Sequence, residues 1–490
     1  MYLLGFDIGS SSVKASLVDA LTRKTVASSF SPKTEMKITA RKPGWAEQDP
    51  EMWWENLKAA NKDVLNKSGI CAKDIVAIGI SYQMHGLVLV DDKHDVIRPA
   101  IIWCDSRAVD NGETARRKLG DTFCLNHLLN FPGNFTAAKL LWVKENEPEA
   151  YERALYAVLP GDYIAMRLTG RISTTVSGLS EGTFWDFKRQ RLSTELLDCL
   201  GIDKKIIPPV YPTFCNVATL DPAAAKKLGL SEETKVCYRA GDQPNNAMSL
   251  GVLNPGEAAT TAGTSGVVYG VLDRPAYDRD SRVNTFAHVN YTEDNTRIGA
   301  LLCINGTGSL NSWIRNQILL KKMSYEKMNE EASKSPVGAN GLSVVPFGNG
   351  VERMLCNKET GGSINNINFN IHSIRDVIRA SQEGIAFSFC YGMDIMKSMG
   401  MDVSLIRACN SNMFLSALFR QTLANVSGAT IELFDTDSAA GAAKGAGFGA
   451  GIYASLNEAF DGLTKITSIE PETNLKDEYE DAYNRWKEKF

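Results

Sequence analysis

The chain has 490 residues, of which 44% are hydrophobic and 22% are charged, a composition typical of a soluble globular protein. This length is too great for one ordinary core and predicts two or three domains. The formal net charge of −4 gives no electrostatic basis for nucleic acid or anionic membrane as the main partner.

The cysteines and the N-terminus bear on the compartment. The ten cysteines form no CxxC pair, which argues against a zinc ribbon or a thioredoxin-like site. Scattered cysteines without a disulfide pattern are typical of a reducing compartment, so we expect a cytoplasmic protein. The N-terminus lacks the basic segment of a signal peptide, and no apolar run reaches the length of a membrane span. Five cysteines in apolar stretches are expected to be small core hydrophobes: Cys71, Cys237, Cys303, Cys390 and Cys409.

The first predicted unit is a β-hairpin. Residues 2–8 are apolar except for Gly5 and Asp7, which predicts a buried strand, and a serine-rich turn leads into a second β-like run at 15–18. Asp7, at the strand end, is a candidate to hold Mg²⁺ through water. An ordinary hairpin with serine at its turn is the alternative. Backbone amides and hydroxyls at such a tip can surround phosphate oxygens, and the candidates are Gly9, Ser10, Ser11, Ser12 and Lys14.

A second candidate site follows the predicted helix at 51–66. Residues 75–81 read as a buried strand and end in a polar loop that contains Gln83, Met84 and His85. Open α/β sheets bind ligands at the carboxyl ends of their strands, so these three residues are candidates for substrate contacts. A satisfied structural role for the single histidine is the alternative.

The middle of the chain contains the stretch 240–247. It follows an apolar run and precedes a helical pattern, which predicts a strand, a tight glycine turn with Asp242 at its crest, and a helix. The alternative is a simple helix entry with Gln243 as N-cap and Pro244 at the first helical position. No Gly/Ser-rich or Pro-rich linker interrupts the chain before about Gly251, so the first half is predicted to be one α/β domain.

The second half repeats the opening pattern. Residues 257–270 read as strand, small-residue turn and strand, with Gly263, Thr264 and Ser265 in the turn. Two such hairpins predict a duplicated domain with a nucleotide phosphate tail between the halves. A hinge at 253–256 gives domains 1–253 and 254–490.

The remaining predicted elements are mostly helical. Helices are predicted at 373–399 and 413–428, and a small-residue helix at 438–447 is expected to pack closely against a neighbour, with Gly441 as its one candidate for a functional contact. The charged tail, residues 477–490, reads as a solvated helix.

These residues, taken in order, resemble the FGGY carbohydrate kinases, and within them the xylulokinases. The likeness spans nearly the whole chain and includes residues 5–14, 45–50, 83–86, 139–142, 241–242 and 263–266. It implies an α/β fold of two ribonuclease H/actin-like ATPase domains with an interdomain cleft. The implied reaction is transfer of the γ-phosphate of ATP to a sugar hydroxyl with Mg²⁺.

The resemblance also implies residue roles. Asp242 is expected to be the catalytic base, and Asp7 the metal-side carboxylate. The N-terminal domain is expected to bind the sugar and the C-terminal domain the nucleotide. Sugar contacts are expected from Gln83, Met84, His85 and Gln243, and nucleotide contacts from Gly9, Ser10, Ser11, Ser12, Lys14, Gly263, Thr264, Ser265, Gly308, Asn412 and Gly441. The partner is a small-molecule sugar, and a homodimer is the assembly left open.

Three departures from the family pattern stand out. The family's Thr-Asp before a serine-rich turn appears here as Thr174-Thr175. Residues 409–416 replace the Gly-Gly-Gly-Ala adenosine loop of many relatives, so the adenine pocket is expected to be built differently. Gln243 is one methylene longer than the asparagine usual in xylulokinases. The preferred reading is a D-xylulose kinase. A kinase for another ketose or polyol, a nucleotide-dependent binding protein of the actin or chaperone type, and a catalytically silent sugar sensor stay open.

Overall fold

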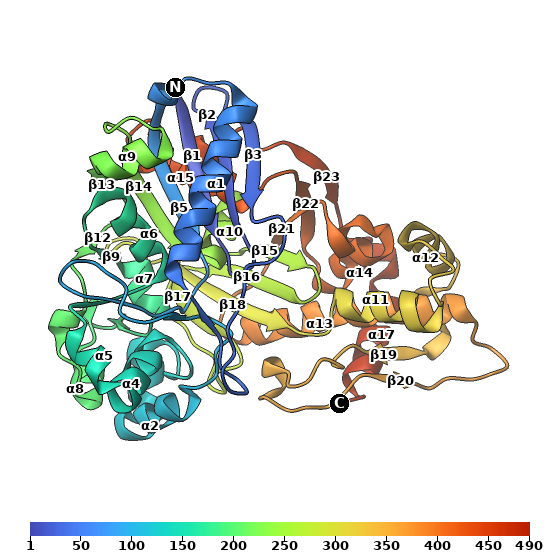
Figure 1. Cartoon of the computed structure of the whole chain (residues 1–490). Helices are drawn as coiled ribbons and strands as arrows, with labels where there is room; N and C mark the ends of the chain where they lie inside the picture. The colour runs from blue at the N-terminus through green and yellow to red at the C-terminus, as the bar shows by residue number, and fades with distance from the viewer. The chain divides into compact units, whose positions relative to one another are not determined.

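The structure is a computed structural model that describes residues 1–490, and it divides into two compact units (Figure 1). Unit 1 comprises residues 1–251, 286–297 and 436–463, and unit 2 comprises residues 252–285, 298–435 and 464–490. The first boundary lies two residues from the expected one. The expected division into two continuous blocks differs from the structure, because two later segments return to unit 1. The expected cleft stays a prediction.

Unit 1 is built on a six-stranded sheet. Strands β1, β5 and β14 are parallel neighbours, and β2, β3 and β13 are antiparallel to the strands beside them. The order is β13 (Phe214–Thr219), β14 (Lys235–Gly241), β5 (Ile75–Tyr82), β1 (Tyr2–Ile8), β2 (Val13–Asp19) and β3 (Thr25–Ser31). The parallel strands are buried almost throughout, as their near-continuous apolar runs predict.

Two helices cover the opposite faces of this sheet. Helix α1 (Pro50–Ser68) buries Trp53 and Trp54 in the core that it shares with β1 and β5. Helix α15 (Ser438–Gly449) approaches much more closely, because a Cβ on Gly5 of β1 would lie 1.8 Å from the carbonyl oxygen of Ala439. The prediction that this small-residue helix packs tightly is confirmed, and the contact explains why the segment from residue 436 belongs to unit 1.

Unit 1 contains further helices and short strands. Its helices are α2 (Val109–Leu119), α3 (Asp121–Phe123), α4 (Thr136–Asn146), α5 (Pro148–Arg153), α6 (Pro160–Thr169), α7 (Val176–Glu181), α8 (Thr194–Leu200), α9 (Pro222–Leu228), α10 (Asp242–Ser249) and α16 (Leu456–Phe460). Its short strands are β4 (Glu47–Gln48), β6 (Val88–Val90), β7 (Ala100–Ile101), β8 (Tyr156–Val158), β9 (Thr174–Thr175), β10 (Trp185–Asp186), β11 (Arg191–Leu192) and β12 (Val210–Tyr211).

Unit 2 repeats the strand topology of unit 1. Here β15 pairs antiparallel with β16 and parallel with β21, as β1 does with β2 and β5. The order is β18 (Ile298–Ile304), β16 (Gly266–Leu272), β15 (Glu257–Ala262), β21 (Leu405–Cys409), β22 (Thr430–Phe434) and β23 (Lys465–Ile469). The predicted duplication of the hairpin is therefore confirmed at the level of topology.

The remaining elements are α11 (Gly308–Trp313), α12 (Tyr325–Ala332), α13 (Ile374–Ser398), α14 (Ala417–Ser427), α17 (Lys476–Lys487), β17 (Asn284–Ala287), β19 (Ser343–Val345) and β20 (Ser363–Asn365). The expectation of a solvated C-terminal helix is wrong. Tyr479, Tyr483 and Trp486 of α17 are buried, and the Trp486 indole donates a hydrogen bond of 2.9 Å to the carbonyl of Val344.

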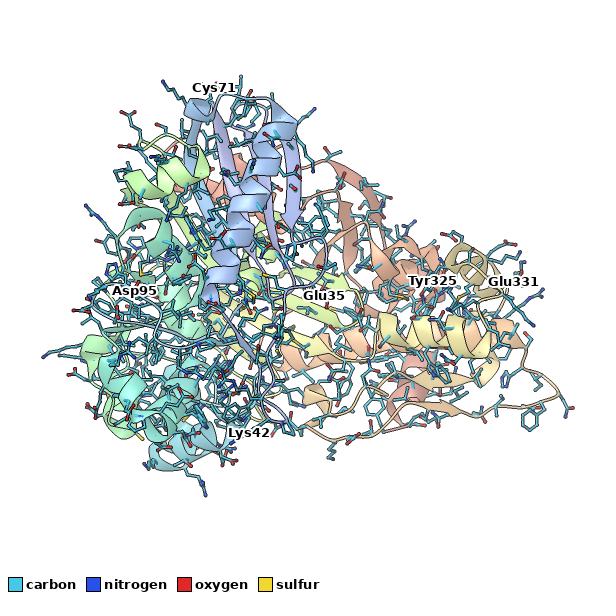
Figure 2. The ribbon with its side chains drawn as sticks, viewed as in Figure 1. Glu35, Lys42, Cys71, Asp95, Tyr325 and Glu331 are labelled. Carbon is cyan, nitrogen blue, oxygen red and sulfur yellow. The ribbon has the colours of Figure 1, made fainter.

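None of the ten cysteines forms a disulfide bond. Cys237 and Cys390 are buried as predicted, but Cys71 and Cys303 are exposed. Cys303 faces outward from β18 because side chains alternate along a strand, and Cys71 lies at the periphery of unit 1 (Figure 2). None of the helices combines the length and the apolar character that a bilayer span requires. The cytoplasmic location and the homodimer stay predictions.

Candidate active site

Strand pairing brings three predicted site segments of unit 1 to one edge of its sheet. In the parallel pair β1–β5, Asp7 stands opposite Ser81, and in the pair β14–β5, Gly241 stands opposite Tyr82. Asp7, the loop after Tyr82 and the residue after Gly241 therefore follow neighbouring parallel strands at their carboxyl ends. This is where an open α/β sheet offers a ligand site.

Asp242 is the first residue of α10, after Gly241 as N-cap. The alternative of a helix entry is right about the helix but wrong about its cap, since it placed Gln243 as N-cap and Pro244 at the first helical position. The helix starts earlier, and proline is tolerated at its third position because the first turn has no intrahelical partner for that N–H. Burial of the carboxyl and the negative charge of Asp7 raise the pKa of Asp242 to about 7. A carboxylate that titrates near neutrality suits a general base.

Asp7 is buried and held by hydroxyl donors. Its Oδ1 accepts a 2.9 Å hydrogen bond from Ser81, its Oδ2 accepts one of 2.7 Å from Ser438, and the Lys14 ammonium lies 3.7 Å from Oδ2. No cluster of three or more His, Cys, Asp or Glu side chains could bind a metal alone. Mg²⁺ keeps several waters and takes one or two carboxylates together with substrate phosphates. Asp7, with Asp242 nearby, fits that kind of site.

The first hairpin tip is closed by its own backbone and by neighbours. The amide of Gly9 donates a 3.1 Å hydrogen bond to the carbonyl of Ser12, and the side-chain amide of Gln48 donates one of 2.7 Å to the carbonyl of Ser10. Ser11 is exposed, and Lys14 is half-exposed beside Asp7. The predicted phosphate-contacting residues of unit 1 therefore lie together on one ordered turn next to the carboxylates.

Gln83 and Met84 are more buried than substrate contacts usually are. Gln83 is 2% exposed, and its side-chain Oε1 has no hydrogen-bond partner. Met84 is 5% exposed and lies over Gly241, where a Cβ would come within 2.5 Å of its Cγ. Glycine is therefore required at position 241 so that Met84 can lie against the strand end that carries Asp242.

His85 is held in a backbone conformation that is unusual for a side chain other than glycine. Its φ is +62°, in the left-handed region. The backbone amide donates a 3.3 Å hydrogen bond to Oε2 of Glu181, and the ring Nδ1 lies 3.0 Å from the carbonyl oxygen of Glu181. The ammonium of Lys139 donates a 2.8 Å hydrogen bond to the carbonyl of His85. The ring packs against Phe135 and Phe286, with centroids 4.8 and 5.3 Å away. These contacts stabilise a strained conformation, which is common at functional sites.

Sequence reasoning did not assign roles to Glu181 and Lys139. Lys139 is fully buried and donates a second bond of 3.0 Å to the carbonyl of Ile102, and burial lowers the pKa of its ammonium to about 7. Glu181 ends α7 with its side chain 2% exposed. For Lys139 the available signal was an ionisable residue within an otherwise apolar run, at 137–143.

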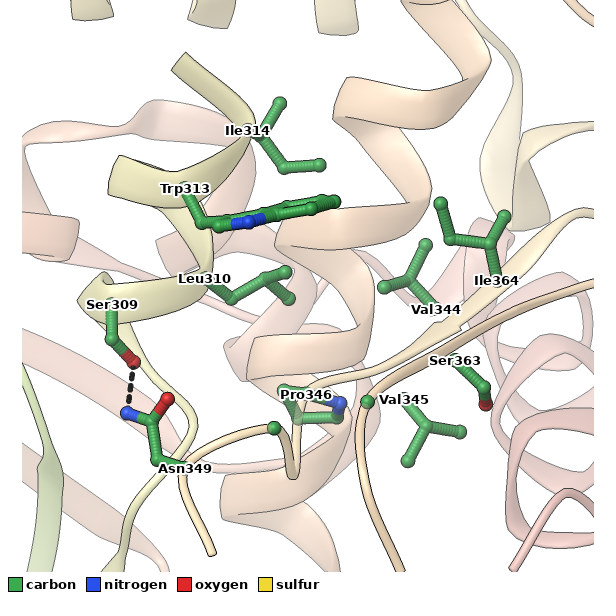
Figure 3. A pocket seen from close by; sticks show the side chains of 12 residues that line it. Ser309, Leu310, Trp313, Ile314, Val344, Val345, Pro346, Asn349, Ser363 and Ile364 are labelled. Carbon is green, nitrogen blue, oxygen red and sulfur yellow. Dashed lines mark hydrogen bonds between the residues drawn. The ribbon is translucent and has the colours of Figure 1, made fainter. Parts of the chain in front are cut away.

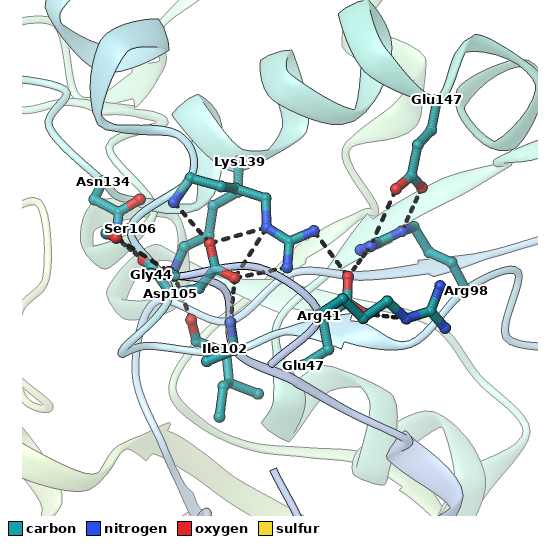
Figure 4. Close-up of polar contacts among 12 residues, drawn as sticks. Arg41, Gly44, Glu47, Arg98, Ile102, Asp105, Ser106, Asn134, Lys139 and Glu147 are labelled. Atoms are coloured by element: carbon teal, nitrogen blue, oxygen red, sulfur yellow. Dashed lines mark hydrogen bonds and ion pairs between the residues drawn. The ribbon is translucent and has the colours of Figure 1, made fainter. Parts of the chain in front are cut away.

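A buried ion network lies beside Lys139 (Figure 4). Arg107 contacts Glu47 at 2.8 Å and Asp105 at 2.7 Å, and Arg98 contacts Glu147 at 2.6 Å. The carboxylate of Asp105 also opposes the lowering of the Lys139 pKa. The stretch 45–50 that carries part of the family likeness is thus structural here, because each buried charge has a partner.

The nucleotide candidates of unit 2 are gathered around the second hairpin tip. The amide of Gly308 donates a 2.8 Å hydrogen bond to the carbonyl of Gly263, and the amide of Ser309 donates one of 3.1 Å to the carbonyl of Thr264. A Cβ on Gly308 would lie 2.4 Å from that carbonyl of Gly263, so glycine is required. The side-chain amide of Asn412 lies 3.7 Å from the Cβ position of Gly263. Ser265 is in the same turn between β15 and β16.

Gly441 lies elsewhere, within α15 of unit 1. It is buried, and a Cβ there would come within 1.7 Å of the hydroxyl of Ser249. Close packing of α15 on α10 accounts for this glycine. Its contact with the nucleotide stays a prediction.

Next to the second tip, unit 2 has an apolar cavity of about 380 Å³ (Figure 3). It begins beside Ser309, whose hydroxyl accepts a 2.7 Å hydrogen bond from the side-chain amide of Asn349. Its apolar lining consists of Leu310, Trp313, Ile314, Val344, Val345, Pro346 and Ile364. A mostly apolar cavity of this size with a few polar groups at its rim is typical of a small-molecule site.

Solved structures share this fold over the full chain. The xylulose kinase from Rhodospirillum rubrum matches with a TM-score of 0.89 at 23% identity and covers 100% of this chain and 98% of that one. The gluconate kinase from Lactobacillus acidophilus matches with a TM-score of 0.90 at 23% identity and covers 99% and 97%. The predicted fold class of two actin-like α/β domains is confirmed.

Curated relatives and family models agree with the structures. The xylulose kinase of Bacillus subtilis is 29% identical over 502 residues, which cover 99% of this chain and 97% of the relative. That of Escherichia coli K12 is 27% identical and covers 91% and 88%. The N-terminal domain of the FGGY family of carbohydrate kinases matches residues 2–249, and its C-terminal domain matches residues 258–450. The chain therefore belongs to the FGGY family of carbohydrate kinases.

Proposed function

We propose that the protein transfers the γ-phosphoryl group of ATP to a ketopentose, converting D-xylulose to D-xylulose 5-phosphate. The observation that carries this proposal is Asp242, a carboxyl with a pKa of about 7 at the strand edge that also holds His85. The curated relatives named xylulose kinases support the choice of sugar.

The reaction needs one proton acceptor. The terminal hydroxyl oxygen of the sugar attacks the γ-phosphorus, the bond from that phosphorus to the bridging oxygen of ADP breaks, and the hydroxyl proton passes to Asp242. Most of the catalysis in such transfers is positioning and charge stabilisation. A positioned base contributes about 10²–10⁴-fold. His85 and Gln243 are proposed to hold the sugar, with Met84 as an apolar wall and Gln83 behind it.

ATP and Mg²⁺ are proposed to use candidate residues from each of the two units. Asp7 would hold Mg²⁺, which when bound neutralises charge on the phosphate oxygens. The phosphates would contact the tips that contain Ser10–Ser12 in unit 1 and Gly263–Ser265 in unit 2. Adenine would enter the apolar cavity that Trp313 lines. This cavity would take over the role of the Gly-Gly-Gly-Ala adenosine loop, whose place in the sequence is occupied by residues 409–416.

One residue favours a second candidate sugar. Gln243 reaches one methylene farther than asparagine, which would suit another ketose or a polyol with a differently placed hydroxyl. Nothing else in unit 1 favours such a ligand over D-xylulose.

A substrate panel tests the proposal. Purified protein is mixed with ATP, Mg²⁺ and each of a set of ketoses and polyols, and ADP release is followed. We expect D-xylulose to give the highest kcat/KM, and Asp242→Asn to abolish turnover while ATP still binds. A higher kcat/KM for a polyol would replace the sugar assignment, and near-normal turnover of the variant would remove the base assignment. Absence of sugar-stimulated ADP release would contradict kinase activity towards the panel.

A further inference from the structure

Glu181 is a buried carboxyl that touches His85, a proposed sugar contact. It contacts His85 in three ways. Its Oε2 accepts the His85 amide at 3.3 Å, its backbone carbonyl lies 3.0 Å from the ring Nδ1, and its Oε2 lies 3.8 Å from the same nitrogen. The same Oε2 lies 3.2 Å from the Cβ position of Gly241, next to Asp242. The side chain thus joins the end of α7 to the ends of β5 and β14.

The contact to the backbone carbonyl defines the state of the imidazole. A carbonyl oxygen only accepts, so Nδ1 must carry the proton in the 3.0 Å hydrogen bond. In the neutral ring, Nε2 is then the acceptor. An imidazolium would have a donor at both nitrogens and could not accept the proton of a sugar hydroxyl.

The surroundings of the Glu181 carboxyl keep it from acting as a counter-ion. Its Oε1 has no hydrogen-bond partner, although the hydroxyl of Tyr82 lies nearby. Two cations lie in this region: Arg239 pairs with Asp162 at 2.7 Å, and Lys139 donates its hydrogen bonds to the carbonyls of His85 and Ile102. Burial raises the pKa of Glu181 well above its ordinary value, and the charges of Asp242 and Asp162 add to this rise. Tyr82 and the His85 amide oppose it. A neutral acid does not stabilise an imidazolium.

We propose that Glu181 is a positioning residue: its carboxyl holds the left-handed backbone of His85, so that the imidazole keeps its proton on Nδ1 and presents Nε2 as an acceptor for a sugar hydroxyl. The sugar contact rests on the proposed function, whereas the tautomer does not. Glu181 itself is buried and acts through His85.

The tautomer can be measured without any substrate. In protein with ¹⁵N-labelled histidine, the five imidazoles are followed by NMR, and His85→Gln identifies the signals of His85. We expect His85 to be neutral with its proton on Nδ1. In Glu181→Ala the ring should exchange between its two neutral tautomers. A proton on Nε2 in the wild-type protein, or an unchanged spectrum in Glu181→Ala, would overturn the proposal.

Kinetics separate a neutral carboxyl from an ionised one. Glu181→Gln keeps an acceptor for the His85 amide, so the sugar KM should stay within about threefold, whereas Glu181→Ala should raise it about tenfold or more with the ATP KM unchanged. Equal losses in both variants would show that an ionised carboxylate is needed and would contradict the proposal. Glu383→Gln, a buried carboxyl in unit 2 paired with Arg379 at 2.7 Å, is the matched control and should leave the sugar KM unchanged. If no sugar is phosphorylated, the proposed function fails while the NMR measurement still decides the role of Glu181.

Discussion

At the scale of the residue, the ionised form of the candidate base lowers the stability of the folded protein. Asp7 and Asp242 lie at the carboxyl ends of β1 and β14, the two strands on either side of β5, and the charge of Asp7 opposes ionisation of Asp242. Like charges at close range and burial both favour the protonated form of an acid. Such a carboxyl is retained against its effect on stability, which is typical of functional groups.

This cost has a defined pH dependence. The pKa of Asp242 is about 7 in the fold against an ordinary value of 3.8, so the folded protein binds the proton more tightly and loses stability as pH rises from about 4 to 7. Asparagine has no such loss. Asp242→Asn should therefore raise the unfolding temperature at pH 8, and the gain should shrink as pH falls and vanish near pH 4. Thermal unfolding followed by circular dichroism measures this. A gain that is independent of pH would contradict the raised pKa.

The two ligand sites can be separated by paired substitutions. His85→Ala should raise the sugar KM about tenfold, because a buried hydrogen bond is worth about 1 kcal/mol or more, and leave the ATP KM unchanged. Trp313→Ala, in the cavity of unit 2, should do the reverse. Steady-state kinetics with each substrate varied in turn tests both. Equal effects of one variant on both KM values would argue against its assigned ligand.

At the scale of the element, local patterns predicted what local forces determine. The long helix expected at 373–399 runs from Ile374 to Ser398, because an amphipathic repeat and a capping box define it. The C-terminal helix was expected to be solvated because it is highly charged, yet its aromatic side chains are buried. A spaced set of aromatics on one face, at 479, 483 and 486, was the signal for burial. The start of α10 was misplaced because proline was assumed to take the first helical position.

Helix α15 shows how small residues permit a close contact between elements. A Cβ on Gly79 of β5 would lie 1.9 Å from the carbonyl oxygen of Ala442, a backbone atom that cannot rotate away. Gly79→Ala should lower the free energy of unfolding by about 1–3 kcal/mol or more through overpacking. Gly462→Ala, where the nearest atom lies 3.5 Å away, should change it by about 0.5 kcal/mol or less. Urea unfolding of both variants provides the measurement, and equal stabilities would contradict the close packing.

At the scale of the whole molecule, the sequence predicted the duplication but not the exchange of segments. Two hairpins with small-residue tips are visible as local patterns, and both occur in sheets of the same topology. The strand-end positions of Asp7, His85 and Asp242 followed from the same reasoning. Glu181 and Lys139 were not assigned roles because each reaches His85 from a distant part of the chain. The return of residues 436–463 to unit 1 likewise depends on long-range packing.

That return makes the folding of unit 1 depend on residues near the end of the chain. A chain that ends at residue 435 lacks α15, so Gly5 and Gly79 would leave an open apolar face on β1 and β5. A chain that ends at residue 463 keeps every segment of unit 1 and loses only β23 and α17 of unit 2. Hydrogen exchange should therefore show protected amides in β1 and β5 of the longer chain and none in the shorter one, since core strands exchange only on global unfolding. Protection of these strands in the chain ending at 435 would mean that α15 is dispensable for unit 1.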